Sequence, residues 1–146
     1  MEENVARASG RCCRRGDCGE GRPGGAMRGL LEPAILAALG VRPRHGYQLR
    51  AALDESTAGL LTVDPGGLYR VLRRIEEDGL VRSSWESGEY GPQRRTYELT
   101  EDGLDALRCW IDRLKVRRDV IDGIAAAARA AVGNARPLST HTTYEE

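Results

Sequence analysis

The chain has 146 residues, enough for one domain with a hydrophobic core and short extensions but too few for a multidomain assembly. It carries 22 basic and 22 acidic residues, so its net charge is zero and any binding to nucleic acid depends on where the basic residues lie. No segment has the roughly 20 apolar residues that cross a bilayer, and the N-terminal segment lacks the apolar run of a signal peptide. We therefore expect a cytoplasmic protein with no membrane partner.

Residues 1–26 are rich in glycine and arginine and show no hydrophobic period. Such a segment cannot offset the entropy of folding, so we expect a disordered N-terminal extension. Met27 stands just before the first periodic segment, and the sequence leaves open whether residues 1–26 belong to the mature protein.

The four cysteines do not form a recognisable framework. Cys12, Cys13 and Cys18 have a CC-x4-C spacing that fits no standard zinc pattern, and Cys109 stands alone in a helical segment. We expect reduced thiols, with Cys109 packed as a small hydrophobic residue. Metal or redox sensing by the three N-terminal cysteines remains the alternative, because neighbouring arginines lower the pKa of a thiol.

Two helices are predicted at the start of the folded part. Residues 30–39 (LLEPAILAAL) form an apolar helix, with Pro33 placed in its opening turn and Gly40 ending it. A second, short helix starts near Gly46, where the apolar residues of GYQLRAAL fall on one face.

The third helix has the clearest signals. Asp64 is a typical N-cap, Pro65 occupies the first helical position, and Gly79 stands just beyond the end. Its apolar face consists of Leu68, Val71, Leu72 and Ile75. Its opposite face is expected to carry Tyr69, Arg70, Arg73 and Arg74.

A two-stranded hairpin is predicted next. Residues 81–85 and 95–99 alternate apolar and polar side chains around a glycine- and proline-containing turn, and Arg94 and Arg95 flank its tip. The predicted organisation is a DNA-binding domain over residues 27–99, a helix over 100–132 and a flexible tail over 133–146.

The final helix is capped by Thr100 and carries a heptad-like apolar stripe. The stripe, interrupted by Arg118, consists of Leu104, Leu107, Ile111, Leu114 and Ile121. An exposed strip of this kind predicts pairing with a second copy of the chain. Trp110 lies one position off the stripe, where it either packs in the core or forms an aromatic wall for a planar effector.

Three helices followed by a hairpin form the order of a winged helix-turn-helix domain, so the predicted fold class is mainly α with a small β-hairpin. The third helix of such a domain can enter the major groove of DNA. Gly66 and Gly67 remove side chains at the start of this helix, where backbone amides can hold a phosphate. The basic face of the helix and the two wing arginines together favour DNA binding.

Three runs of the sequence resemble the PadR family of bacterial transcriptional regulators: HGYQLRAAL (45–53), VDPGGLYRVLRRIEEDGLV (63–81) and RRTYELTEDGLDAL (94–107). The resemblance implies a homodimeric winged-helix protein, usually a repressor, that small phenolic or drug-like ligands release from DNA. The residues that match positions supporting or touching DNA are Tyr47, Gly67, Tyr69, Arg73, Arg94 and Arg95. The family places a small hydroxyl residue where Gly67 stands, which puts one phosphate contact in doubt.

The predicted function is sequence-specific transcriptional regulation by a homodimer that binds an inverted-repeat operator in double-stranded DNA and responds to a small aromatic or drug-like effector. No catalytic constellation, cofactor motif or standard metal pattern is present in the sequence, so we expect neither an enzyme nor a cofactor or metal site. The alternative is a winged-helix module that binds protein without reading DNA, because fold does not determine function.

Overall fold

A computed structural model describes residues 25–88 and 91–135, with side chains described from residue 29 onward. Its elements are α1 (Gly25–Val41), β1 (Arg44–His45), α2 (Gly46–Ser56), α3 (Pro65–Glu77), β2 (Val81–Glu86), β3 (Arg94–Leu99) and α4 (Glu101–Asn134). Within these described ranges, no helix is long and apolar enough to cross a membrane. Disorder was predicted for residues 1–26, but Gly25 and Ala26 are helical, as the first residues of α1. Residues 1–24, with the roles considered for their three cysteines, lie outside the described part of the chain.

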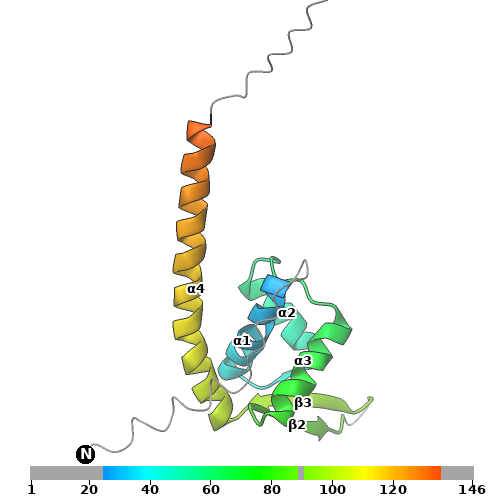
Figure 1. Ribbon diagram of the computed structural model, residues 1–146. Coiled ribbons are helices and arrows are strands. Elements are labelled where there is room, and N and C mark those ends of the chain that lie inside the picture. The colour runs from blue at the N-terminus through cyan, green and yellow to red at the C-terminus, as the bar shows by residue number, and fades with distance from the viewer. Residues whose placement is uncertain (1–24, 89–90, 136–146) are drawn as a thin grey trace, which may run out of the picture. The chain divides into compact units, whose positions relative to one another are not determined.

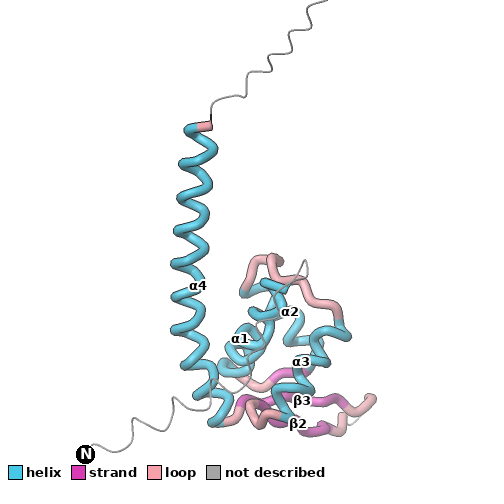
Figure 2. Tube along the Cα trace, in the orientation of Figure 1, coloured by secondary structure: helices cyan, strands magenta, loops and turns pink. Residues whose placement is uncertain are grey.

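The three N-terminal helices gather against a small antiparallel sheet (Figure 1). The sheet has the strand order β1-β3-β2, so β3 lies in the middle (Figure 2). The hairpin of β2 and β3 confirms the sequence prediction, with Val81 opposite Leu99 and Glu86 opposite Arg94. Strand β1 was not predicted, because its two residues are too few to show an alternating pattern.

The core lies between the helices and the sheet. The apolar face predicted for α3 is confirmed, since Leu68, Leu72 and Ile75 are buried and Val71 is half-buried. Burying each such side chain contributes about 1.5–3 kcal/mol. The other buried hydrophobic residues are Leu31, Ile35, Leu36, Leu39, Leu49, Leu53, Leu61, Val81 and Tyr97.

Helix α1 differs from its prediction at the N-terminal end. The helix begins at Gly25 rather than near Leu30, so Pro33 lies inside it and not in its opening turn. Proline has no N–H, so it cannot donate the hydrogen bond to the carbonyl four residues earlier. The structure accommodates this loss within a continuous helix.

The turn that follows α3 lies against the start of α4, although β2 and β3 separate the two in the chain. Gly79 has a φ of 77°, as the predicted helix end requires. Thr100 caps α4 as predicted, since its Oγ1 accepts a hydrogen bond from the N–H of Gly103 at 3.1 Å. The same hydroxyl donates to the carbonyl of Gly79 at 2.6 Å. A Cβ atom on Gly103 would overlap the backbone carbonyl oxygen of Leu80, so the contact between this turn and α4 depends on glycine there.

The chain divides into two compact units, one ending at Ile111 and the other beginning at Asp112. In the first unit Ala106, Leu107 and Trp110 of α4 pack against the winged-helix core. Leu107 was expected in the dimer stripe, but it faces this core. Cys109 is half-buried on α4.

Candidate DNA-binding surface

The N-terminus of α3 is built as the sequence predicted. The Asp64 carboxylate accepts a hydrogen bond from the N–H of Gly67 at 2.8 Å, and Pro65 is at the start of the helix. A Cβ atom on Gly67 would crowd the Asp64 carboxylate at 2.8 Å, so glycine at this position allows the cap to close. Gly66 is exposed, and the positive end of the helix dipole is directed toward solvent here. Such an end attracts a phosphate group.

The outer face of α3 presents one aromatic and two basic side chains. Tyr69 is half exposed, and Arg70 and Arg73 are exposed. Arg70 bends back so that its Nε donates to the carbonyl of Gly66 at 3.3 Å, while part of its guanidinium remains available. Tyr69 lies against the start of α2, because a Cβ atom on Gly46 would be 2.5 Å from its hydroxyl oxygen.

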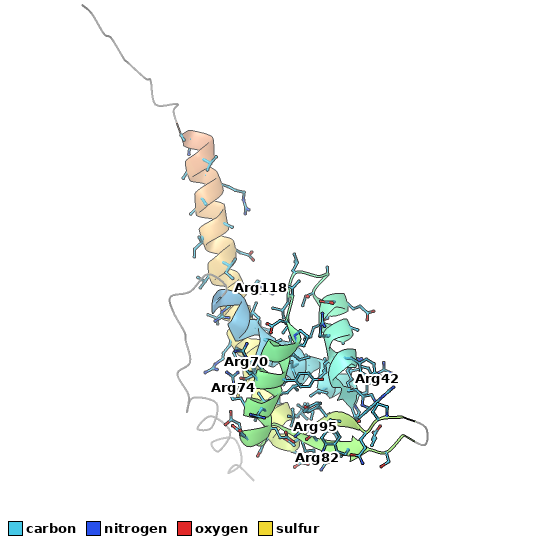
Figure 3. The ribbon with its side chains drawn as sticks, turned by 90° about the vertical axis from the view of Figure 1, so that its right-hand side faces the viewer. Arg42, Arg70, Arg74, Arg82, Arg95 and Arg118 are labelled. Carbon is cyan, nitrogen blue, oxygen red and sulfur yellow. The ribbon has the colours of Figure 1, made fainter. Side chains whose placement is uncertain are left out.

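Arg74 does not share that outward face. It is half-buried, and its Nη2 lies 2.9 Å from Oε2 of Glu32 on α1. Position 74 is at the border of the apolar face, next to Ile75, so a carboxylate on the neighbouring helix can reach it. Figure 3 shows Arg70 and Arg74 on the same helix, but the two side chains have different partners. Arg74 was predicted among the DNA contacts, and its position argues for a structural role instead.

Tyr47 of α2 and Arg94 of β3 form a second exposed group. Arg94 donates to the Tyr47 hydroxyl at 3.2 Å, and its guanidinium carbon lies 5.7 Å from the centre of the tyrosine ring. His45 also stacks on Tyr47, with its ring centroid 5.6 Å from that of the tyrosine. Nδ1 of the His45 ring in turn lies 3.0 Å from Oγ1 of Thr96, within hydrogen-bond distance. The structure thus brings together Tyr47 and Arg94, which were predicted as separate DNA-binding residues from the sequence.

Arg95 has a different environment from Arg94. Its Nη2 donates to Glu76 of α3 at 2.7 Å, and its Nε donates to the Ser83 hydroxyl at 2.8 Å. Ser83 itself donates to Glu76. The guanidinium also lies over the ring of Tyr97 at 5.5 Å. Arg95 therefore ties the wing to α3, whereas the sequence predicted an outward side chain for binding phosphate (Figure 3).

Tyr97 is the buried base of this network. Burial raises the pKa of its phenol, an effect that the Arg95 guanidinium partly opposes. The phenol consequently stays neutral at physiological pH. The charged groups of the network are therefore the Arg95 guanidinium and the Glu76 carboxylate.

Three further residues escape sequence reasoning. Glu76 lies in an acidic run that reads as a solvated helix end, and Glu32 has no motif around it. Trp85 is 63% exposed, and the Arg95 guanidinium carbon lies 5.9 Å from the centre of its ring. The alternation of β2 places Trp85 on the same face as Val81 and could have indicated that it lies near α3. An exposed tryptophan here adds an aromatic surface to the wing.

No group of three or more His, Cys, Asp or Glu side chains that could hold a metal ion occurs within residues 25–88 and 91–135. What these residues offer is a helix end that attracts anions, the outward arginines of α3 and the Tyr47–Arg94 pair on the wing side. Features of these kinds can contact the phosphates and base edges of a nucleic acid.

The order of three helices and a hairpin, with an outward basic face on the third helix, defines a winged helix-turn-helix protein. The comparison with protein families is specific: the model of the PadR-like family of transcriptional regulators matches residues 35–109. The chain belongs to this family, as the sequence resemblance indicated. The family consists of transcriptional regulators rather than enzymes.

Individual relatives agree with this assignment. The transcriptional regulator YqjI of Escherichia coli is 30% identical over 112 residues, which cover 72% of this chain and 50% of YqjI. The probable transcriptional regulator Rv1176c of Mycobacterium tuberculosis is 30% identical over 81 residues, covering 56% of this chain and 43% of that protein. This chain therefore spans half or less of the length of these two relatives.

Solved structures show the same fold. A transcriptional regulator from Thermoplasma acidophilum is 32% identical, with a TM-score of 0.62 and coverage of 69% of this chain and 95% of that one. Bacillus subtilis PadR, solved in complex with operator DNA, is 21% identical, with a TM-score of 0.52 and coverage of 56% and 47%. This second likeness establishes the shared fold alone.

Proposed function

We propose that this PadR-like regulator reads DNA with α3 and holds the backbone with the Tyr47–Arg94 pair. The observation that carries the proposal is the exposed group of Tyr69, Arg70 and Arg73 directly after a capped, glycine-containing helix start. Arginine forms bidentate hydrogen bonds to guanine, and the helix fits a major groove about 12 Å wide. The operator complex of Bacillus subtilis PadR supports the same use of the fold here.

The proposed active form is a homodimer that represses transcription from an inverted-repeat operator in the cytoplasm. In the second compact unit, Val116, Val120, Ile121 and Ile124 of α4 are all more than half exposed. A strip of apolar side chains of this size is unusual on a monomer and is covered by a second copy in our proposal. A two-fold dimer presents its recognition helices one or two turns of DNA apart, at about 10 bp per turn.

Release from DNA by a small aromatic or drug-like ligand completes the proposal. Trp110 supplies the aromatic surface that such a ligand needs, although its ring packs partly against the core and its indole N–H is bonded to Glu32. An effector at this position would therefore have to use the part of this half-buried side chain that remains accessible.

Replacing Arg73 with alanine should weaken binding to the true operator by about 10-fold and flatten the preference at one base position. The effect on scrambled duplex should be much smaller, because a base contact contributes little there. Binding to both duplexes, measured at several salt concentrations, tests this. Arg108→Ala is the matched control, since this exposed arginine of α4 pairs with Asp105. Equal losses on both duplexes would contradict a base-reading role for Arg73.

Arg94→Ala and Arg95→Ala should fail in different ways. Loss of Arg94 should weaken all duplexes alike and reduce the salt dependence by roughly one released ion. Loss of Arg95 should mainly lower the unfolding temperature, because its guanidinium is engaged by Glu76 and Ser83. Thermal unfolding and salt titrations of both variants separate the two roles. If the wild-type protein bound duplex DNA without salt dependence, a protein-interaction module would replace the DNA-binding proposal.

A further inference from the structure

One carboxylate connects three helices of the first compact unit. Glu32 lies on α1, and its side chain is 22% exposed. Its Oε2 accepts a hydrogen bond from Nη2 of Arg74 on α3 at 2.9 Å. Its Oε1 accepts one from the indole Nε1–H of Trp110 on α4 at 3.1 Å. The two oxygens of one side chain therefore hold the helix proposed to read DNA and the first turns of the helix proposed to pair two copies.

The chemistry of the Glu32 carboxylate suits it to fixing the angle between α3 and the start of α4. A carboxylate has two acceptor oxygens in a rigid plane, and hydrogen bonds from a guanidinium are short and directional. The Trp110 ring is held separately by packing against the core, so its N–H has little freedom to turn away. A half-buried ion pair by itself contributes little net stability, because desolvation offsets much of the attraction. The main contribution of this carboxylate is therefore to orient the two helices rather than to stabilise the fold.

We propose that Glu32 is a positioning residue that sets the orientation of α3 relative to the start of α4, and thereby the separation of the two recognition helices in the dimer. The inference rests on the proposed DNA-binding and dimer functions. The separation of half-sites that a two-fold regulator accepts is determined by this geometry. After a small rotation of α3, each subunit could still bind one half-site. The dimer could no longer bind both half-sites at the same time.

The decisive variant is Glu32→Gln in the full chain. Glutamine has one acceptor oxygen, so it cannot accept from Arg74 and Trp110 at opposite ends of the group. The probes are duplexes that carry the half-site selected by the wild-type protein from a random pool, either singly or as inverted repeats whose separation increases by one base pair at a time. Wild type should show one preferred separation. Glu32→Gln should bind the best repeat about 10-fold more weakly, with a flat dependence on separation, while keeping its affinity for the single half-site within about twofold.

Two companion variants sharpen the test. Trp110→Phe keeps an aromatic ring but removes the N–H, and it should also flatten the dependence on separation. Glu98→Gln is the matched control, because this carboxylate accepts a hydrogen bond from Arg82 at the surface and touches neither α3 nor α4 through it. It should retain the wild-type preference.

A spectroscopic readout reports the contact directly. In a Trp85→Phe background Trp110 is the sole tryptophan, because the chain has two. Its fluorescence emission should shift when Glu32 is replaced with Gln and remain unchanged when Glu98 is replaced with Gln.

The outcomes are distinct. Absence of a preferred separation in wild type would remove the proposed function itself. A wild-type preference that Glu32→Gln retains would overturn the positioning role. Equal losses on the single half-site and on the repeats, together with a lower unfolding temperature, would show a structural role only and would also overturn it.

Discussion

Replacing Ile111 and Ile121 together with glutamate should convert the protein from a dimer to a monomer and lower its affinity for a paired operator by about 100-fold or more. Both side chains are exposed in the single chain, at 48% and 57%. In the proposed dimer they are buried, where two new carboxylates would lose their hydration without gaining partners. Sedimentation equilibrium and binding to a two-half-site duplex measure the two effects.

The choice of these positions follows from the structure. Leu107 belonged to the predicted stripe, but a charge there would disturb the winged-helix core that it packs against. Lys115→Glu offers a control in which an exposed charge on the same helix is reversed without loss of apolar surface. It should remain dimeric. A wild-type protein that sediments as a monomer at micromolar concentration would refute the dimer proposal before any variant is made.

The substitution Gly103→Ala should lower the free energy of unfolding by about 3 kcal/mol, the upper part of the range for overpacked sites. The added methyl group would overlap the Leu80 carbonyl oxygen, which accepts a hydrogen bond from the N–H of Thr100 at 3.1 Å. Backbone cannot turn aside as a flexible side chain can. Either α4 moves away from the turn or the Thr100 hydrogen bonds are lost. Denaturant unfolding monitored by circular dichroism measures the loss.

Gly123→Ala provides the comparison for this prediction. This glycine also lies inside α4, but a Cβ atom would meet nothing within 4 Å. Alanine should therefore stabilise the helix by up to about 1 kcal/mol through its higher helix propensity. If both alanine variants were equally stable, the close approach between Gly103 and Leu80 would not exist in solution.

Features encoded by neighbouring residues were predictable. The Asp64 cap, the apolar face of α3 and the Gly79 helix end all follow from short-range backbone chemistry, and the structure confirms each of them. The hairpin and the Thr100 cap were found for the same reason. Such signals lie within one or two turns of chain, so a single sequence contains all the information that they need.

Features that depend on distant partners could not be predicted. Helical periodicity places Arg74 at the edge of a polar face, but only the packing of α1 brings Glu32 within 2.9 Å of it. Arg95 likewise has the sequence context of a solvated turn, and its pairing with Glu76 requires the sheet to lie against α3. An arginine that binds a carboxylate of its own protein and one that awaits a phosphate look identical in a sequence.

The apolar stripe of α4 was ambiguous for a related reason. Leu107 and Ile121 both fit one heptad pattern, yet Leu107 serves the core of the winged-helix unit and Ile121 is exposed. A heptad pattern indicates that a face is covered but does not say by which neighbour. Only the fold shows whether a residue of the stripe packs against the winged-helix core or stays exposed for a second copy of the chain.

The bond between Arg95 and Glu76 has a consequence for the thermodynamics of binding. Because it anchors the wing to α3 close to the hairpin turn in the free protein, part of the conformational entropy that association would otherwise cost has already been lost on folding. A wing held in this way meets the DNA backbone in a preorganised state. Loosening it should appear chiefly as a larger entropic penalty on binding, with the contacts to the duplex unchanged.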